Sequence, residues 1–391
     1  MVDHGELDLL QPPLHQDWPV AASVRMPMAR VEQASLAWVN WALAEDDPVF
    51  SALGRDEEAY RSHLLDQCAY RVTSHGPGEH FAAADRYGGR WLAGNGGAGR
   101  AAFLNQYYVK GVGRTPLLGV SDDFSHASGD AYLEEAVREA IFAEIFHAEC
   151  PFGAIRTLAI MTYGQSVFWD AVDKTETLVL VIRRRFMRIG HFARALGFKS
   201  FVERDGSADD ARVADMLMRF REAKGSDGVF RWLNLVGEAA AMQLGYFFAH
   251  RLNQGSPTLS NWSCNAAILD FGASSSIPSY RHINLDPVGV GVAYPNNVHG
   301  LISELAGLFR QVELHLGASA APFDHARVIK AYTAQVHTQL LRIVGFSSQQ
   351  ISDASAAERH AFGQAADAFI ATEQQSTVDL LRALACFDHR A

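Results

Sequence analysis

The pattern of the chain changes near Arg184, and this change limits the possible folds more than any other feature of the sequence. Before it, glycine-rich turns alternate with short aromatic and β-branched stretches, most clearly over Phe81–Val120. After it, apolar residues recur every three to four positions. The first pattern is typical of strands and the second of amphipathic helices. The order predicts an α+β chain with an N-terminal arm and helix (1–50), a strand-containing unit (51–184) and a helical unit (185–391).

Particular segments carry these patterns most clearly. Asp130–Ala148 has helical spacing, with Leu133, Val137, Ile141 and Ile145 on one face, and begins at an N-cap residue. The other expected helices are Met28–Ala44, Asp209–Lys224, Phe230–Leu252, His299–Leu316, His325–Val344 and Ala356–Ala385, and the expected strands are Ile155–Tyr163 and Thr177–Arg183.

Charge and hydropathy narrow the classes of function. The 391 residues carry a formal net charge of −10, which argues against a general nucleic-acid binder because phosphate backbones are held by clustered cations. No apolar stretch approaches the roughly 18–20 residues that span a bilayer, and the start of the chain does not resemble a secretory signal. We therefore expect a cytoplasmic protein with neither a nucleic-acid nor a membrane partner. The cysteines lack metal-ligand spacing and are expected to be reduced thiols: Cys68, Cys150, Cys264 and Cys386.

A glycine-rich segment, Gly94–Arg100, matches the pattern G-x-G-x-x-G. Such glycines allow a main chain to approach a phosphate closely. A dinucleotide-binding fold would require a helix directly after the motif, whereas the following residues, Ala101–Gly113, look like a strand. Three interpretations remain open: a dinucleotide motif, a loop without a ligand, and a kinase-like phosphate loop between two strands.

Lys110 and Glu139 form a second candidate feature. The chain has only five lysines, so a lysine at the end of the strand-like Phe103–Val109 suggests a specific role, such as holding a phosphate. An edge-strand lysine that discourages aggregation is the alternative. Glu139, on the expected helix, could pair with Lys110 as in kinase folds, although neighbouring glutamates show that a solvated helix face supplies the same residue type.

A third feature is Asp270-Phe271-Gly272, which follows a short apolar strand. Asn261 precedes the aspartate by nine residues, and carboxylate and amide oxygens are suitable ligands for Mg²⁺. An arginine-rich stretch from Arg183 to Arg188 lies at the junction of the two parts and could hold a polyphosphate or could be a solvated basic turn.

Taken in order, these motifs resemble the selenoprotein O family, kinase-like proteins that transfer AMP from ATP to protein hydroxyls. The similarity covers roughly residues 80–275, and its most specific blocks are similar to K-G-A-G-R-T-P and R-F-G-H-F. The matching segments are Ala93–Ala101, Lys110–Pro116, Val137–Glu139, Arg188–Phe192, Asn261 and Asp270–Gly272.

The resemblance implies a bilobal protein-kinase-like fold, with ATP bound so that its α-phosphate faces the acceptor. It further implies Mg²⁺, or Mn²⁺, as the metal, and a hydroxyl-bearing protein, peptide or small molecule as the acceptor. The implied catalytic residues are Lys110, Glu139, Asn261 and Asp270, the last two as metal ligands. The implied ATP-binding residues are Gly97, Gly99, Arg100, Lys110, Gly129, Asp130, Arg183 and Arg188, with Arg183 as a displaced candidate.

Ser260 stands where the family has the acidic residue of T-D-N, its expected base. A serine hydroxyl is a poor general base near neutral pH. The leading expectation is therefore a Mg²⁺- and ATP-dependent adenylyltransferase that is divergent in its base. The alternatives are a phosphotransferase or ATP-dependent activating enzyme acting on a small metabolite or peptide, and a nucleotide-binding pseudoenzyme.

Overall fold

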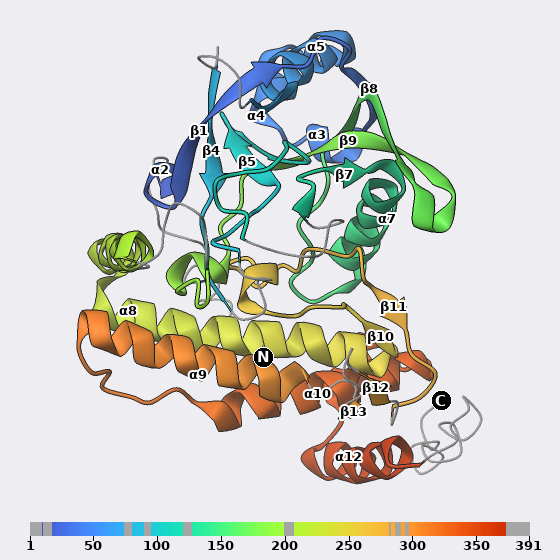
Figure 1. Cartoon of the computed structure of the whole chain (residues 1–391). Helices are drawn as coiled ribbons and strands as arrows, with labels where there is room; N and C mark the ends of the chain where they lie inside the picture. Colours follow the sequence, from blue (N-terminus) through green and yellow to red (C-terminus); the bar gives the residue numbers. More distant parts are fainter. Residues whose placement is uncertain are drawn as a thin grey trace.

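The computed structural model describes residues 10, 18–73, 80–89, 95–119, 127–198, 207–280, 283–285, 291–293 and 297–372. Strands gather in the first part and long helices in the second, as expected for an α+β chain (Figure 1). Gly94, Cys386 and the predicted helical continuation to Ala385 lie outside the described residues. Cys68, Cys150 and Cys264 are buried free thiols, which agrees with the expected reduced state.

The first part is built on one curled antiparallel sheet with the strand order β2-β8-β9-β6-β5-β4-β1-β3, and β7 pairs with β9. Every pairing among the described strands of this sheet is antiparallel, so these strands include no parallel βαβ unit of the kind a dinucleotide fold needs. The strands are β1 Ser23–Arg30, β2 Ser35–Val39, β3 Tyr70–Val72, β4 His80–Asp85, β5 Ala101–Leu104, β6 Tyr107–Lys110, β7 Ala131–Tyr132, β8 Ala159–Trp169 and β9 Lys174–Arg184.

The helix predicted over Met28–Ala44 is wrong. The segment contributes to β1 and forms β2 before the short α3 (Trp41–Ala44). Met26 and Met28 are buried at alternate positions of β1, which lies between β3 and β4 in the sheet. The helical spacing of the apolar residues was thus coincidental, because pairing with distant strands decides the local structure.

The strand predicted over Thr177–Arg183 is confirmed within β9, and the strand predicted over Ile155–Tyr163 is confirmed only from Ala159, where β8 begins. The helix predicted over Asp130–Ala148 is confirmed as α7 (Leu133–Glu149), with Tyr132 and not Asp130 at its N-cap position. Small residues on α7 face the sheet, among them Ala136 and Ala140. The apolar face noted in the sequence points outward instead: Val137, Ile141 and Ile145 are 43%, 56% and 46% exposed. Small inward side chains let α7 lie close to the sheet.

The second part is mostly helical, as predicted. The two helices expected over Asp209–Lys224 and Phe230–Leu252 correspond to the two parts of α8 (Ser207–Ala249), which are separated by a kink at Gly225, where φ is 73°. Figure 1 shows α8 and α9 side by side below the sheet. No helix in the described part of the chain combines the length and the apolar character needed to cross a membrane. The remaining helices are α9 Asn297–Leu316, α10 His325–Ile343, α11 Ser348–Asp353 and α12 Ala356–Ile370.

Shorter elements complete the described chain. They are α2 Trp18–Ala21, α4 Pro48–Ala52, α5 Glu57–Cys68, η2 Asp170–Val172, η3 Ile189–Phe192, η4 Leu259–Asn261, β10 Leu252–Asn253, β11 Ser275–Ser276, β12 Ile283–Leu285 and β13 Gly291–Ala293. One apolar core contains residues of both parts, for example Phe103 and Tyr108 from the sheet and Trp232 from α8. The segment that carries Asn261 and Asp270 contacts both parts, because Ile268 bridges Ala154 and the indole N–H of Trp232 on α8 donates a hydrogen bond to the main-chain oxygen of Cys264.

Candidate functional site

Lys110, the last residue of β6, is buried against α7. Its Nζ lies 2.7 Å from Oε1 of Glu139 and 3.0 Å from Oε1 of Glu135. These two glutamates are one helical turn apart and so point to the same side of α7. The sequence-predicted pair of Lys110 and Glu139 is therefore formed, with a second carboxylate beside it.

Glu139 is the more enclosed of the two carboxylates, with only 1% of its side chain exposed. Its Oε2 accepts a hydrogen bond of 2.6 Å from Nη2 of Arg183. Burial by itself would raise the pKa of the Glu139 carboxyl, but Lys110 and Arg183 outweigh it and hold that pKa well below its ordinary value. Arg183, expected as a displaced nucleotide contact, thus pairs with the glutamate that holds Lys110.

Glu135 was not among the residues selected from the sequence. Its Oε1 accepts hydrogen bonds from Nζ of Lys110 at 3.0 Å and from Nη2 of Arg100 at 3.1 Å. Arg100 also donates from Nη1 to the main-chain oxygen of Asp130 at 3.0 Å. Glu135 lies four residues before Glu139, and this spacing could have identified it from the sequence because it places both residues on one face of a helix.

The D-F-G segment lies against the same helix face. Phe271 is buried and its ring centroid is 5.2 Å from that of Phe146 on α7. A Cβ placed on Gly272 would lie 3.3 Å from Oε1 of Glu135 and 3.6 Å from Oε1 of Glu139. The motif and the ion-pair cluster, separated by roughly 130 residues in sequence, are therefore neighbours in space.

Asp270 differs from its neighbours in exposure and conformation. Leu269 and Phe271 are buried, whereas Asp270 is exposed and has a φ of 67°, in the left-handed region that a non-glycine residue enters at a cost. Among the described residues, none donates a hydrogen bond to its carboxylate. The carboxylate is thus available for a cation, while its main-chain oxygen accepts a hydrogen bond from Gln254 at 2.9 Å.

Asn261 lies beside Asp270 because the intervening chain folds back. Its main-chain oxygen accepts a hydrogen bond of 3.2 Å from the N–H of Leu269, and Trp262 bridges Ile268 in antiparallel fashion. Nδ2 of Asn261 donates a hydrogen bond of 2.8 Å to the main-chain oxygen of Ser256. The described residues contain no group of three or more histidine, cysteine or carboxylate ligands. An amide and a carboxylate oxygen fit Mg²⁺ only as part of a set completed by phosphate and water oxygens.

The glycine-rich loop connects the antiparallel strands β4 and β5, so the dinucleotide interpretation is wrong. Gly97 has a φ of 145°, and a Cβ there would lie 2.3 Å from the main-chain oxygen of Asp85. A Cβ on Gly99 would lie 2.6 Å from Cδ1 of Leu118. Close packing on the main chain therefore accounts for Gly97, whereas Gly99 faces the end of a flexible side chain. The expected contact of both glycines with phosphates stays a prediction.

Gly129 and Asp130 also have partners within the protein. The main-chain oxygen of Gly129 accepts a hydrogen bond of 3.0 Å from the N–H of Gly113, and Asp130 forms an ion pair with Arg71. Their position next to Arg100 agrees with the predicted site, but the Asp130 carboxylate points to Arg71.

Arg188, expected to clamp the nucleotide, is 5% exposed. Its Nη1 donates to the main-chain oxygen of Ser260 at 2.5 Å and its Nη2 to Oη of Tyr108 at 2.9 Å. Its Nε lies 3.5 Å from Oδ2 of Asp85, whose Oδ1 is 2.6 Å from Nε2 of the buried His191. Arg188 therefore joins β6 of the sheet to the segment that carries Asn261.

Ser260, the residue at the position of the expected base, is also buried. Its Oγ lies 2.7 Å from Oγ1 of Thr258, within hydrogen-bond distance. His250, a histidine that precedes this segment, has its Nε2 at 3.3 Å from Oε1 of Gln339 on α10, and burial lowers its pKa.

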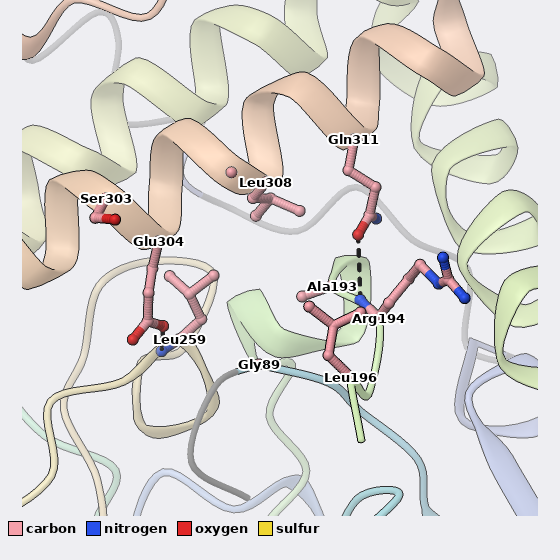
Figure 2. Close-up of a pocket in the computed structure, with 10 residues that line it drawn as sticks. Gly89, Ala193, Arg194, Leu196, Leu259, Ser303, Glu304, Leu308 and Gln311 are labelled. Atoms are coloured by element: carbon pink, nitrogen blue, oxygen red, sulfur yellow. Dashed lines mark hydrogen bonds between the residues drawn. The ribbon is translucent and has the colours of Figure 1, made fainter. Parts of the chain in front are cut away.

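A cavity of about 130 Å³ lies between α9 and the chain around Arg194 (Figure 2). Its polar residues hold the neighbouring main chain: Glu304 accepts from the N–H of Leu259 at 3.1 Å, and Gln311 accepts from that of Arg194 at 3.3 Å. None of the cluster around Lys110 lines it. The cavity is therefore a separate feature.

Comparison with models of known protein families finds no match, and comparison with curated proteins finds no similar sequence.

Proposed function

We propose that this protein is a Mg²⁺- and ATP-dependent nucleotidyltransferase with a bilobal kinase-like arrangement, and that it transfers AMP to a hydroxyl of a protein or peptide. The observation that carries the proposal is the buried pair of Lys110 and Glu139, which packs against the D-F-G segment. In kinase-like enzymes a strand lysine held by a helix glutamate contacts the phosphates, and the D-F-G aspartate binds the metal.

Each charged residue then has a role in holding the nucleotide. Lys110 and Arg100 supply positive charge at one end of the central strands β5 and β6, and Glu139 with Arg183 fixes the position of Lys110. Asn261 and Asp270 would hold Mg²⁺, which neutralises phosphate charge when bound. Phosphate-centred transfer depends mainly on such positioning and electrostatic stabilisation, so the reaction requires few covalent contributions from the protein.

The transfer step forms a bond between the acceptor oxygen and the α-phosphorus and breaks the bond from that phosphorus to the bridging oxygen, releasing pyrophosphate. The acceptor loses its proton. Ser260 offers no carboxylate to receive it, and its hydroxyl already has Thr258 as a partner. We propose that the proton passes to solvent, which is compatible with a largely dissociative transition state.

Parallel assays with ATP labelled at the α- or the γ-phosphorus separate this proposal from the alternatives. Label transferred to an acceptor from α-labelled ATP alone supports adenylyl transfer. Label transferred from γ-labelled ATP alone supports the phosphotransferase alternative instead. Nucleotide binding without consumption of ATP across many acceptors supports the pseudoenzyme, the alternative that the buried Ser260 favours.

A further inference from the structure

We propose that the Glu135 carboxylate occupies the position of a phosphate oxygen in the nucleotide-free protein, and that an oligophosphate displaces it from Lys110 and Arg100. This inference rests on the proposed function for the identity of the ligand, but its geometry belongs to the described residues alone. Glu135 would then be a built-in competitor that weakens nucleotide binding.

Two cations converge on one oxygen of Glu135. Its Oε1 lies 3.0 Å from Nζ of Lys110 and 3.1 Å from Nη2 of Arg100. Lysine and arginine donors at this spacing bind a phosphate oxygen as they bind a carboxylate oxygen, since both carry negative charge and accept more than one hydrogen bond. The position therefore suits an anionic oxygen from either source.

The two glutamates that face Lys110 differ in burial. The Glu135 side chain is 27% exposed and can turn towards water, whereas that of Glu139 is 1% exposed. Glu139 also retains Arg183 as a partner at 2.6 Å. Lys110 would remain held by Glu139 after Glu135 leaves, so the displacement leaves no buried ion without a partner.

The same Glu135 oxygen lies near the segment that carries the candidate metal ligand. A Cβ on Gly272, two residues after Asp270, would lie 3.3 Å from Oε1 of Glu135. A phosphate oxygen in that position would have cations on one side and the D-F-G segment on the other. The ligand class that fits is an oligophosphate, as in a nucleoside triphosphate.

If the Glu135 carboxylate must leave before the ligand binds, the apparent affinity equals the intrinsic affinity multiplied by the fraction of molecules in which the carboxylate has already left. Isothermal titration calorimetry with inorganic tripolyphosphate, without divalent ions, measures this directly. We expect Glu135→Gln to bind tripolyphosphate about tenfold more tightly than the wild type. The matched control is Glu134→Gln, which alters an exposed glutamate paired with Lys174 and should leave the affinity within about twofold.

Unchanged or weaker binding by Glu135→Gln would overturn the proposal, as would the absence of binding by both proteins at millimolar tripolyphosphate. If Glu135→Gln does not fold, Glu135→Asp provides the test, because it keeps the charge but is too short to reach both cations. It should bind about threefold more tightly than the wild type. Tighter tripolyphosphate binding in a protein that never consumes ATP would refute the proposed function and leave this inference standing.

Discussion

Lys110 is held by two carboxylates, and Glu139 keeps Arg183 when the lysine is removed. We therefore expect Lys110→Ala to lower transfer from α-labelled ATP by at least about 100-fold, the size of effect seen when an electrostatic contact to a reacting phosphate is lost. Circular dichroism should show a folded protein. The matched control is Lys174→Ala, which removes a surface lysine and should leave the rate unchanged. If Lys110→Ala kept wild-type activity, the assignment of Lys110 to the site would be wrong.

Glu139 makes stability depend on pH. Its pKa in the folded protein is lower than in the unfolded chain, so its stabilisation is present above the ordinary carboxyl pKa and is lost as pH falls below it. Glu139→Gln should lower the free energy of unfolding at pH 7 by about 3 kcal/mol, because Lys110 and Arg183 lose a buried partner. Urea unfolding at pH 7 and at pH 4 should show a smaller difference for the variant than for the wild type. An equal pH dependence in both proteins would contradict this assignment.

At the scale of single elements, α7 shows an unusual distribution of side chains. Ala140 faces the sheet, whereas Ile141 is 56% exposed. We expect Ala140→Leu to destabilise the protein by about 1–3 kcal/mol through overpacking, and Ile141→Gln to change its stability by no more than about 0.5 kcal/mol. Urea unfolding of the two variants is the measurement. The reverse order of effects would mean that α7 is rotated relative to the orientation described above.

The sequence predicted the helix α7 and the ion pair between Glu139 and Lys110, but it did not predict the role of Glu135. The spacing of four residues from Glu139 places Glu135 on the same helix face, but its contact with Arg100, which comes from a distant loop, is set by tertiary structure. Arg183 was missed as the partner of Glu139 for a similar reason. Its side chain reaches Glu139 because β9 pairs with β6, with Arg183 opposite Tyr108 and Val181 opposite Lys110. Such non-local strand pairing leaves no local signal in the sequence.

The glycine-rich loop shows a different limit. The sequence predicted a strand directly after the loop, which β5 confirms, and a loop between two strands was one of three interpretations left open. The residue type alone cannot distinguish a glycine that approaches a phosphate from one that packs on main chain. The carbonyl oxygen of Asp85 would lie 2.3 Å from a Cβ at Gly97, so packing alone requires the glycine there. Contact with a nucleotide at this loop remains a prediction.

At the scale of the whole molecule, Arg188 connects the two parts. Its guanidinium joins Tyr108 and Asp85 on one side to Ser260 on the other, and all of these residues are buried. We expect Arg188→Ala to lower the free energy of unfolding by about 3–5 kcal/mol, since it leaves Asp85 with one fewer cation in a buried site. Urea unfolding measures this loss. A variant of wild-type stability with weakened ATP binding would instead support the nucleotide clamp expected from the sequence.

The change from strands to helices near Arg184 was predictable because two different hydrophobic periods meet there. The contact between the two parts was not predictable from the sequence. It is made by one apolar core that contains side chains of both parts, including Phe103 and Trp232. The candidate site lies on this shared boundary, with Lys110 and Glu139 from the first part and Asn261 and Asp270 from the second. The residue types of the site were predictable from the order of the motifs along the chain. The burial of these residues and the ion pairs of Glu135 and Arg183 depend on tertiary packing.

Above all, we propose that these residues together bind ATP with a divalent ion. The most direct measurement is the thermal unfolding of the wild type and of Asp270→Ala with ATP, in the presence and absence of Mg²⁺. A ligand at a hundredfold excess over its Kd stabilises the folded state by about 2.7 kcal/mol. We predict that Mg²⁺ increases the rise in Tm that ATP gives the wild type, and that it gives no such increase in Asp270→Ala. If the Tm of the wild type did not rise with ATP and Mg²⁺, or rose equally in Asp270→Ala, the proposal that these residues bind ATP with a divalent ion would be contradicted.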